Sequence, residues 1–158
     1  MNTRIRPMTR ADKPAVMDIL QTTPQFLPAE VVVAEEVLDC YLDDPSAGYF
    51  TLVAESDHAI AGYVCYGETP LTECTWDIYW IAVSPHHQKR GIGGALIADA
   101  EKEIARKNGR MVMAETSSKP DYDNTHRFYL SQGYRLVAQI SDYYAPGDNI
   151  MFFQKLLK

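Results

Sequence analysis

The sequence predicts an α/β fold in a single domain spanning residues 1–158: a mixed, mostly antiparallel seven-stranded sheet with about four helices on its faces. Two observations predict it. Stretches with strand periodicity alternate with longer stretches of helical periodicity, in the order β-α-α-β-β-β-α-β-α-β-β. A glycine-rich turn at residues 88–95 stands between an expected strand and an expected helix. A chain of this length can bury a substantial hydrophobic core.

The first part of the chain is expected to fold as one strand and two helices. The strand covers residues 3–8, and residues 9–12 provide a cap for a helix that ends near residue 21. The second helix covers residues 29–42, where apolar residues recur at helical spacing until Asp44 and Pro45 end it.

The remaining elements follow from the same signals. Strands are expected at residues 49–54, 59–66, 75–83, 110–115, 134–141 and 150–156, and helices at 92–107 and 124–131. Asn108 and Gly109 are a typical helix C-terminal signal, and a turn at Pro146, Gly147 and Asp148 joins the last two strands.

Composition excludes several classes of protein. The net charge of −6, from 15 basic and 21 acidic residues, argues against nonspecific nucleic-acid binding, which needs a basic face. No apolar run approaches the roughly 20 residues that span a bilayer, so no membrane association is expected. No secretory signal is visible, and the odd, scattered cysteines Cys40, Cys65 and Cys74 indicate reduced thiols and a cytoplasmic protein.

The glycine-rich turn is the most informative stretch of the chain. It reads Gln88, Lys89, Arg90, Gly91, Ile92, Gly93, Gly94. The first N–H groups of a helix have no partner inside the helix, and the helix dipole places partial positive charge there. Gly91 and Gly93 remove the Cβ atoms that would hold a phosphate away, and Lys89 and Arg90 add charge. The turn therefore predicts a diphosphate site.

Three ordered blocks resemble the GNAT superfamily of acyl-CoA-dependent N-acetyltransferases. They are Ile81-Ala82-Val83-Ser84-Pro85, then Gln88-x-x-Gly91-x-Gly93, then Asn124-x-x-Arg127-Phe128-Tyr129-x-x-x-Gly133-Tyr134. A lone glycine motif would be weak evidence, but three blocks in the right order at suitable spacing are strong evidence. The resemblance covers nearly the whole chain and is weakest in the first 45 residues.

The resemblance implies acetyl-CoA as cosubstrate and no metal. Backbone N–H groups of residues 89–94 would hold the pyrophosphate, the pantetheine arm would pair with the strand at Ile81, Ala82 and Val83, and an N–H of Ile81 or Val83 would polarise the thioester carbonyl. The implied CoA-binding residues are Ile81, Ala82, Val83, Gln88, Lys89, Arg90, Gly91, Ile92, Gly93, Gly94, Asn124 and Arg127.

The family reaction is direct attack of an amine on the thioester in a ternary complex, which needs an acid and a base. The resemblance makes Tyr129 the acid for the departing thiolate, and phenol suits this role because its ordinary pKa lies above that of a thiol. Asp77 on the expected fourth strand and Glu115 at the end of the fifth are equal candidates for the base, and the sequence leaves this choice open.

The acceptor is expected to be a small-molecule amine or an amino-acid derivative. The Tyr143-Tyr144 pair resembles one in peptide N-terminal acetyltransferases, so a peptide or protein N-terminal or lysine acetyltransferase is the alternative. A non-catalytic acyl-CoA-binding regulatory module is a third reading. The acidic second helix region is either a solvated face or a field that attracts a cation. The longer segment at residues 116–123 is either a lid or only a connection, and the resemblance also allows a homodimer.

Overall fold

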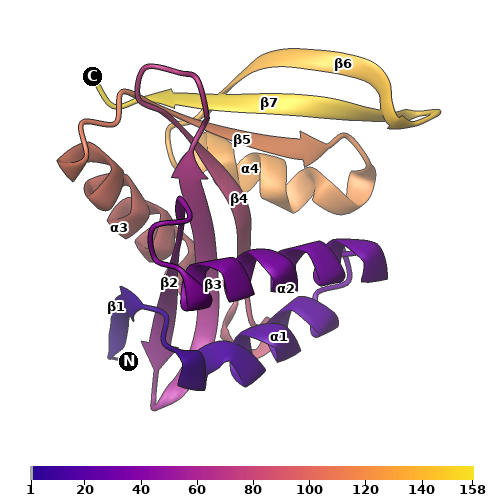
Figure 1. The fold of residues 1–158 in the computed structure, drawn as a ribbon. Helices are drawn as coiled ribbons and strands as arrows, with labels where there is room; N and C mark the ends of the chain where they lie inside the picture. Colours follow the sequence, from indigo (N-terminus) through magenta and orange to yellow (C-terminus); the bar gives the residue numbers. More distant parts are fainter. Residues whose placement is uncertain (1) are drawn as a thin grey trace.

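The computed structural model describes residues 2–158 and confirms the mixed α/β fold (Figure 1). Within these residues the strands are β1 (Thr3–Pro7), β2 (Tyr49–Ser56), β3 (Ala59–Glu68), β4 (Thr75–Val83), β5 (Met111–Ser117), β6 (Arg135–Ala145) and β7 (Asp148–Leu156). The helices are α1 (Lys13–Thr22), α2 (Pro28–Asp43), α3 (Ile92–Arg106) and α4 (Asp123–Ser131), with 3₁₀ turns η1 (Arg10–Asp12), η2 (Pro85–His87) and η3 (Pro120–Tyr122).

All strands belong to one sheet, in the order β1-β2-β3-β4-β5-β7-β6. Neighbours are antiparallel except β4 and β5, which run parallel and are connected through α3, because parallel strands need a long crossover. The β4–β5 pairing is short: it runs from Thr75 opposite Met111 to Ile78 opposite Ala114. Beyond these residues the two strands are not paired, so the sheet opens at its centre.

The helices cover both faces of the sheet, and each face has its own core (Figure 1). One core includes Leu96 and Ile104 of α3 and Tyr129 of α4, packed on the inner strands. The other includes Val16 of α1 and Leu38 of α2. The spacing of these buried residues along each helix is the apolar stripe from which the helices were expected.

The hairpins differ in detail from the expected boundaries. The β2–β3 turn contracts to Asp57 and His58, whose φ angles of +51° and +66° are those of a two-residue turn that matches the strand twist. Strand β6 continues past its expected end at residue 141 to Ala145, which pairs with Asp148. Strand β6 therefore reaches the turn signal at Pro146 and Gly147, and the last residue of the strand is set by its pairing with β7.

A buried carboxylate connects the start of the chain to the sheet. The Asp12 carboxylate accepts hydrogen bonds from Arg6 Nη1 at 2.7 Å, from Arg6 Nη2 at 2.9 Å and from the Thr9 N–H at 2.8 Å. Arg6 also donates to Glu55 on β2 at 3.0 Å. These bonds, chiefly those from Arg6, lower the pKa of Asp12 to about 2.

Replacing Asp12 with Asn is expected to lower the free energy of unfolding by about 1–2 kcal/mol at neutral pH. The folded-state pKa lies below the unfolded value of about 3.9, so the carboxylate stabilises the fold above that pH. This stabilisation is lost as the pH falls toward 2, and there wild type and Asp12→Asn should converge. Urea titrations at several pH values measure this. The exposed Arg10–Asp43 pair at 2.7 Å supplies the control, because Asp43→Asn should change stability by under about 0.5 kcal/mol. Equal effects of both variants would contradict the assignment.

Candidate active site

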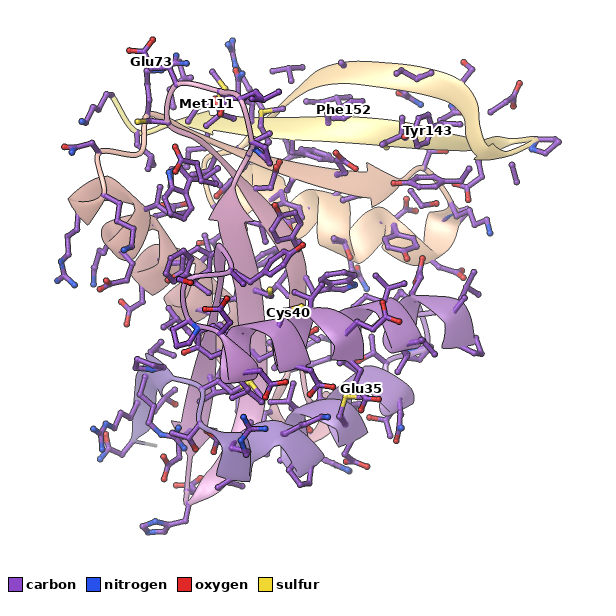
Figure 2. All side chains as sticks on the ribbon, viewed as in Figure 1. Glu35, Cys40, Glu73, Met111, Tyr143 and Phe152 are labelled. Atoms are coloured by element: carbon purple, nitrogen blue, oxygen red, sulfur yellow. The ribbon has the colours of Figure 1, made fainter. Side chains whose placement is uncertain are left out.

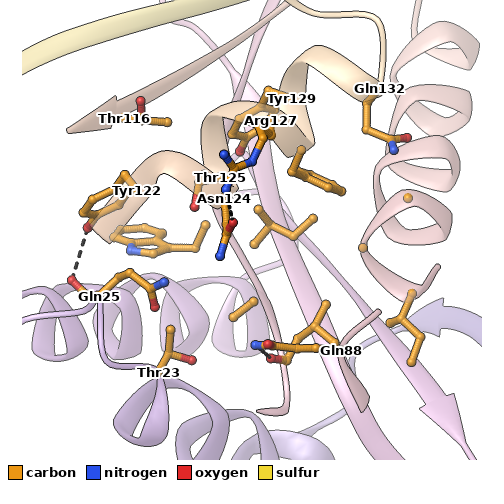
Figure 3. A pocket seen from close by; sticks show the side chains of 18 of the residues that line it. Thr23, Gln25, Gln88, Thr116, Tyr122, Asn124, Thr125, Arg127, Tyr129 and Gln132 are labelled. Carbon is orange, nitrogen blue, oxygen red and sulfur yellow. Dashed lines mark hydrogen bonds between the residues drawn. The ribbon is translucent and has the colours of Figure 1, made fainter. Parts of the chain in front are cut away.

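A cavity of about 630 Å³ lies where β4 and β5 separate (Figure 3). Its walls come from β4, from the turn that opens α3, from the end of β5, from η3 and α4, and from the loop between α1 and α2. These segments are distant in sequence, and the opening of the sheet brings them together. The cavity is therefore a product of the short parallel pairing.

Most of the predicted site residues line this one cavity. They are Ile81, Ala82, Val83, Gln88, Lys89, Gly91, Ile92, Gly93, Gly94, Glu115, Asn124, Arg127 and Tyr129. Arg90 and Asp77 are not among its lining residues. The cavity is also lined by Gln25, Phe26 and Tyr122, which were not among the site residues predicted from the sequence. The only sequence signal for Tyr122 was the unusual length of the 116–123 segment.

The glycine-rich turn adopts left-handed backbone conformations at two positions. Lys89 has φ of +61° and Gly91 has φ of +78°. The bond from the Ala95 N–H to the Gly91 carbonyl, at 3.0 Å, opens α3, and the N–H groups just before it have no acceptor within the helix. A Cβ atom at Gly91 would meet no protein atom within 4 Å, whereas one at Gly93 would lie 3.0 Å from the Phe128 ring. The turn therefore presents donors to open space, as an anion site requires.

The unpaired edge of β4 offers two further donors. The Ser84 N–H donates to the Ala61 carbonyl of β3 at 2.7 Å. Because N–H groups alternate along a strand, those of Ile81 and Val83 point away from β3 and into the opening. The Gln88 side chain donates to the Val83 carbonyl at 3.3 Å. This edge can accept an extended chain as an added strand.

A bulge re-aims one side chain of β4 into the cavity. Tyr66 of β3 pairs with Ile78 and Cys65 pairs with Trp80, so Tyr79 is the extra residue between them. Tyr79 lines the cavity. Burial, together with nearby Asp77, raises its pKa to about 12, so its hydroxyl stays protonated at neutral pH.

Tyr129 is buried in an aromatic cluster and also lines the cavity. Its ring contacts Phe128, Tyr134 and Phe153, at centroid distances of 5.4, 5.3 and 5.8 Å. Within residues 2–158 its hydroxyl has no hydrogen-bond partner. Burial raises its pKa above the ordinary tyrosine value. The hydroxyl is therefore a rigidly held, protonated donor.

The two candidate base residues lie in different settings. Glu115 is exposed at the cavity, and burial together with nearby Asp77 raises the pKa of its carboxyl. Asp77 lies on the paired part of β4, opposite Met113, and accepts a hydrogen bond from the Thr69 hydroxyl. Glu115 therefore lines the cavity and Asp77 does not, and the charge of Asp77 helps to raise the pKa of Glu115.

Asn124 and Arg127, at the start of α4, form a pair. The Arg127 guanidinium donates to Asn124 Oδ1 at 2.5 Å, and both side chains project into the cavity (Figure 3). The pairing orients the Asn124 side-chain amide, whose N–H groups then remain available to a ligand.

Three acidic side chains of α2 form ion pairs with one cation of η1 and one of α1. Lys13 binds Asp39 at 2.6 Å and Glu35 at 3.5 Å, and Arg10 binds Asp43 at 2.7 Å. Figure 2 places Glu35 on α2, and no acidic residue of this helix lines the cavity within residues 2–158. The solvated-face interpretation therefore fits better than a field aimed at the cavity.

The tyrosine pair at the end of β6 is exposed. Tyr143 and Tyr144 pack edge to face at 5.1 Å and lie along the β6–β7 hairpin (Figure 2). The pKa of Tyr144 rises to about 12 through burial and the charge of Glu115. Neither tyrosine is among the residues that line the cavity.

Residues 2–158 contain no cluster of three or more His, Cys, Asp or Glu side chains arranged to hold a metal ion. None of the helices they form has the length and apolar character needed to cross a membrane.

Comparison with known proteins agrees with this geometry. The model of the acetyltransferase (GNAT) family matches residues 14–134. A GNAT-family protein from Desulfovibrio desulfuricans is 36% identical, with 99% of this chain and 100% of that chain covered and a TM-score of 0.95. No curated protein matches the chain.

Two more distant structures share the fold. The yncA protein of Salmonella typhimurium, solved with its cofactor acetyl-CoA, is 23% identical, covers 99% of this chain and 94% of its own, and has a TM-score of 0.80. The ribosomal-protein-S18-alanine N-acetyltransferase of Escherichia coli is 17% identical, with 99% and 95% covered and a TM-score of 0.79. The family match and the cavity together lead to one conclusion: this chain belongs to the GNAT family of acetyltransferases, which use acetyl-CoA as cosubstrate.

Proposed function

We propose that this protein transfers the acetyl group of acetyl-CoA to the primary amine of a small molecule or amino-acid derivative, by direct attack in a ternary complex. One observation carries the proposal. The glycine-rich turn, Tyr129 and Glu115 all line a single cavity. Cosubstrate, acid and base then occupy one continuous space.

The residues present fit acetyl-CoA. The N–H groups at the start of α3 and the open space at Gly91 suit the pyrophosphate. The pantetheine arm suits the free edge of β4, where the N–H groups of Ile81 and Val83 face the opening. Asn124, oriented by Arg127, can donate to an amide of the arm. When bound, acetyl-CoA supplies the activated acetyl group.

Side chains of the protein would then accept a proton from the acceptor and donate a proton to the leaving group. Glu115 takes a proton from the acceptor ammonium, so that the free amine can attack the carbonyl carbon. An N–H of Ile81 or Val83 stabilises the negative charge that develops on the carbonyl oxygen. As the carbon–sulfur bond breaks, Tyr129 gives its proton to the departing thiolate. The attacking nitrogen, which must lose a second proton to become an amide, restores the proton on the Tyr129 oxygen, and Glu115 releases the first proton to solvent. The products are CoA thiol and the acetylated amine.

A peptide or protein acceptor is the second candidate. The exposed Tyr143–Tyr144 pair supports it, because this pair resembles one in peptide N-terminal acetyltransferases. It predicts turnover on peptides and none on free amines.

The proposal is tested by CoA thiol release from acetyl-CoA across amines, amino-acid derivatives, aminoglycosides and peptides. Turnover on a small amine supports it, and turnover confined to peptides supports the second candidate. If acetyl-CoA raises the melting temperature but no acceptor reacts, either the acceptor lies outside the panel or the protein is a binding module. If acetyl-CoA does not bind, the assigned cosubstrate site is wrong.

Replacing Gly91 with Ala is expected to weaken acetyl-CoA binding by about tenfold, which corresponds to the loss of roughly one charge-assisted hydrogen bond. The added Cβ enters the space proposed for the pyrophosphate. Because the backbone φ at residue 91 is +78°, an alanine there also costs about 1 kcal/mol of stability. Gly48 gives a matched control, since it has φ of +95°, no neighbour within 4 Å and no place in this cavity. Gly48→Ala should lose similar stability and keep its affinity in calorimetric titration. Equal affinities in both variants would count against the pyrophosphate site.

A further inference from the structure

The 116–123 segment, which the sequence left as either a lid or a connection, is firmly attached to the start of β7. The Ser118 N–H donates to the Asn149 carbonyl at 2.9 Å, and the Asn149 N–H donates to Ser118 Oγ at 2.8 Å. Ser117 Oγ donates to the Asp148 carboxylate, and Lys119 lies 3.6 Å from the same carboxylate. The segment is therefore a fixed connection and a rigid mount for the residues that follow it.

This fixed segment positions Tyr122 against the loop between α1 and α2. The Tyr122 hydroxyl donates to the Gln25 carbonyl at 3.1 Å, and the Gln25 side chain donates to the Asp121 carbonyl at 3.4 Å (Figure 3). We call these two reciprocal bonds the Gln25–Tyr122 bridge. Burial raises the pKa of Tyr122 to about 12, so its hydroxyl remains a donor at neutral pH.

The bridge lies at the end of the cavity opposite the glycine-rich turn. Gln25 and Tyr122 both line the cavity, and Figure 3 shows them on one side with Gln88 and Gln132 on the other. Acetyl-CoA would fill the part of the cavity beside the glycine-rich turn. The acceptor must therefore bind in the part of the cavity beside the Gln25–Tyr122 bridge. An extended peptide advances about 3.3 Å per residue, so four residues need a clear path of roughly 13 Å.

We infer that the Gln25–Tyr122 bridge closes the acceptor end of the cavity and makes Tyr122 a specificity-determining residue that admits a compact amine and excludes an extended peptide. This inference rests on the proposed function and deepens it by setting the size class of the acceptor. The two bonds join segments 97 residues apart, so an elongated acceptor must either break the bridge or pass around a rigidly mounted ring.

The test uses stable conjugates in which the CoA sulfur is joined through a –CH₂–CO– link to the nitrogen of glycinamide or of tetraglycinamide. Their dissociation constants are measured by calorimetry, so no acceptor need be known. In the wild type, the tetraglycinamide conjugate is expected to bind about tenfold more weakly than the glycinamide conjugate. In Tyr122→Ala this ratio should fall below about threefold, and in Tyr122→Phe, which keeps the ring, it should be intermediate.

Tyr41 provides the matched control. Its hydroxyl also donates to a distant backbone carbonyl, that of Met8 at 3.4 Å, but it does not line the cavity. Tyr41→Phe should keep the wild-type ratio. A wild type that binds both conjugates equally, or a Tyr122→Ala variant with an unchanged ratio, would overturn the inference while leaving the proposed function intact. If neither conjugate nor CoA binds, the proposed function fails and the inference fails with it.

Discussion

Tyr129→Phe is expected to lower kcat by about 10²–10³-fold, because the departing thiolate loses its proton donor. Acetyl-CoA affinity should change little, since the ring keeps its contacts with Phe128, Tyr134 and Phe153. The raised pKa of Tyr129 means that the hydroxyl is protonated throughout the neutral range. The loss of wild-type activity that results from deprotonation of Tyr129 should therefore appear only at alkaline pH, above the ordinary tyrosine pKa of about 10.

Tyr134 supplies a control of the same chemical kind. It is buried beside Tyr129, and its hydroxyl donates to Glu101 at 2.9 Å on the side away from the cavity lining. Tyr134→Phe should lose some stability and retain kcat within about twofold, since it has no part in proton transfer. Steady-state rates of both variants decide the matter, and a Tyr129→Phe enzyme with near wild-type kcat would remove Tyr129 from the reaction.

The second large effect is expected at the base. Glu115→Gln should lower kcat/KM by about 10²-fold at neutral pH, because the amide cannot accept the ammonium proton. Glu115 acts only when ionised, and burial and Asp77 raise its pKa. Wild-type activity should thus fall as the pH drops through a value above the ordinary Glu pKa of about 4.3.

The Asp77→Asn variant distinguishes the role of Asp77 from that of Glu115. Removing its charge should lower the pKa of Glu115, so the acidic limb of the pH–rate profile is expected to move to lower pH while most activity remains. The reverse pattern, in which Asp77→Asn abolishes turnover and Glu115→Gln does not, would make Asp77 the base. If both variants keep the wild-type limb, neither residue is the base.

Local signals predicted the secondary structure well. The helix start at Ile92 follows from Gly91, and the helix end near residue 107 follows from Asn108 and Gly109, since caps depend on a few adjacent residues. Strand ends were less predictable. Strand β6 continues to Ala145 because β7 supplies a partner there, and no residue within β6 indicates this.

The candidate site divides in the same way. The glycine-rich turn and Tyr129 could be named from sequence because they belong to motifs of a few residues. Glu115 could be named only as one of two candidate bases, from its place at the end of a strand. All three line one cavity. Gln25 and Tyr122 could not be named, because their bond joins positions 97 residues apart.

The sequence by itself therefore determined which elements form and which residue types are available for binding an anion and moving protons. Only the tertiary structure decided that the pairing of β4 with β5 ends at Ile78 and Ala114. It also decided that Glu115 lines the cavity while Asp77 does not, and that the Tyr122 hydroxyl bonds to Gln25. The reason is physical. Caps, turns and periodicity are set by neighbours along the chain, whereas a cavity depends on how far packed elements separate, which no single segment encodes.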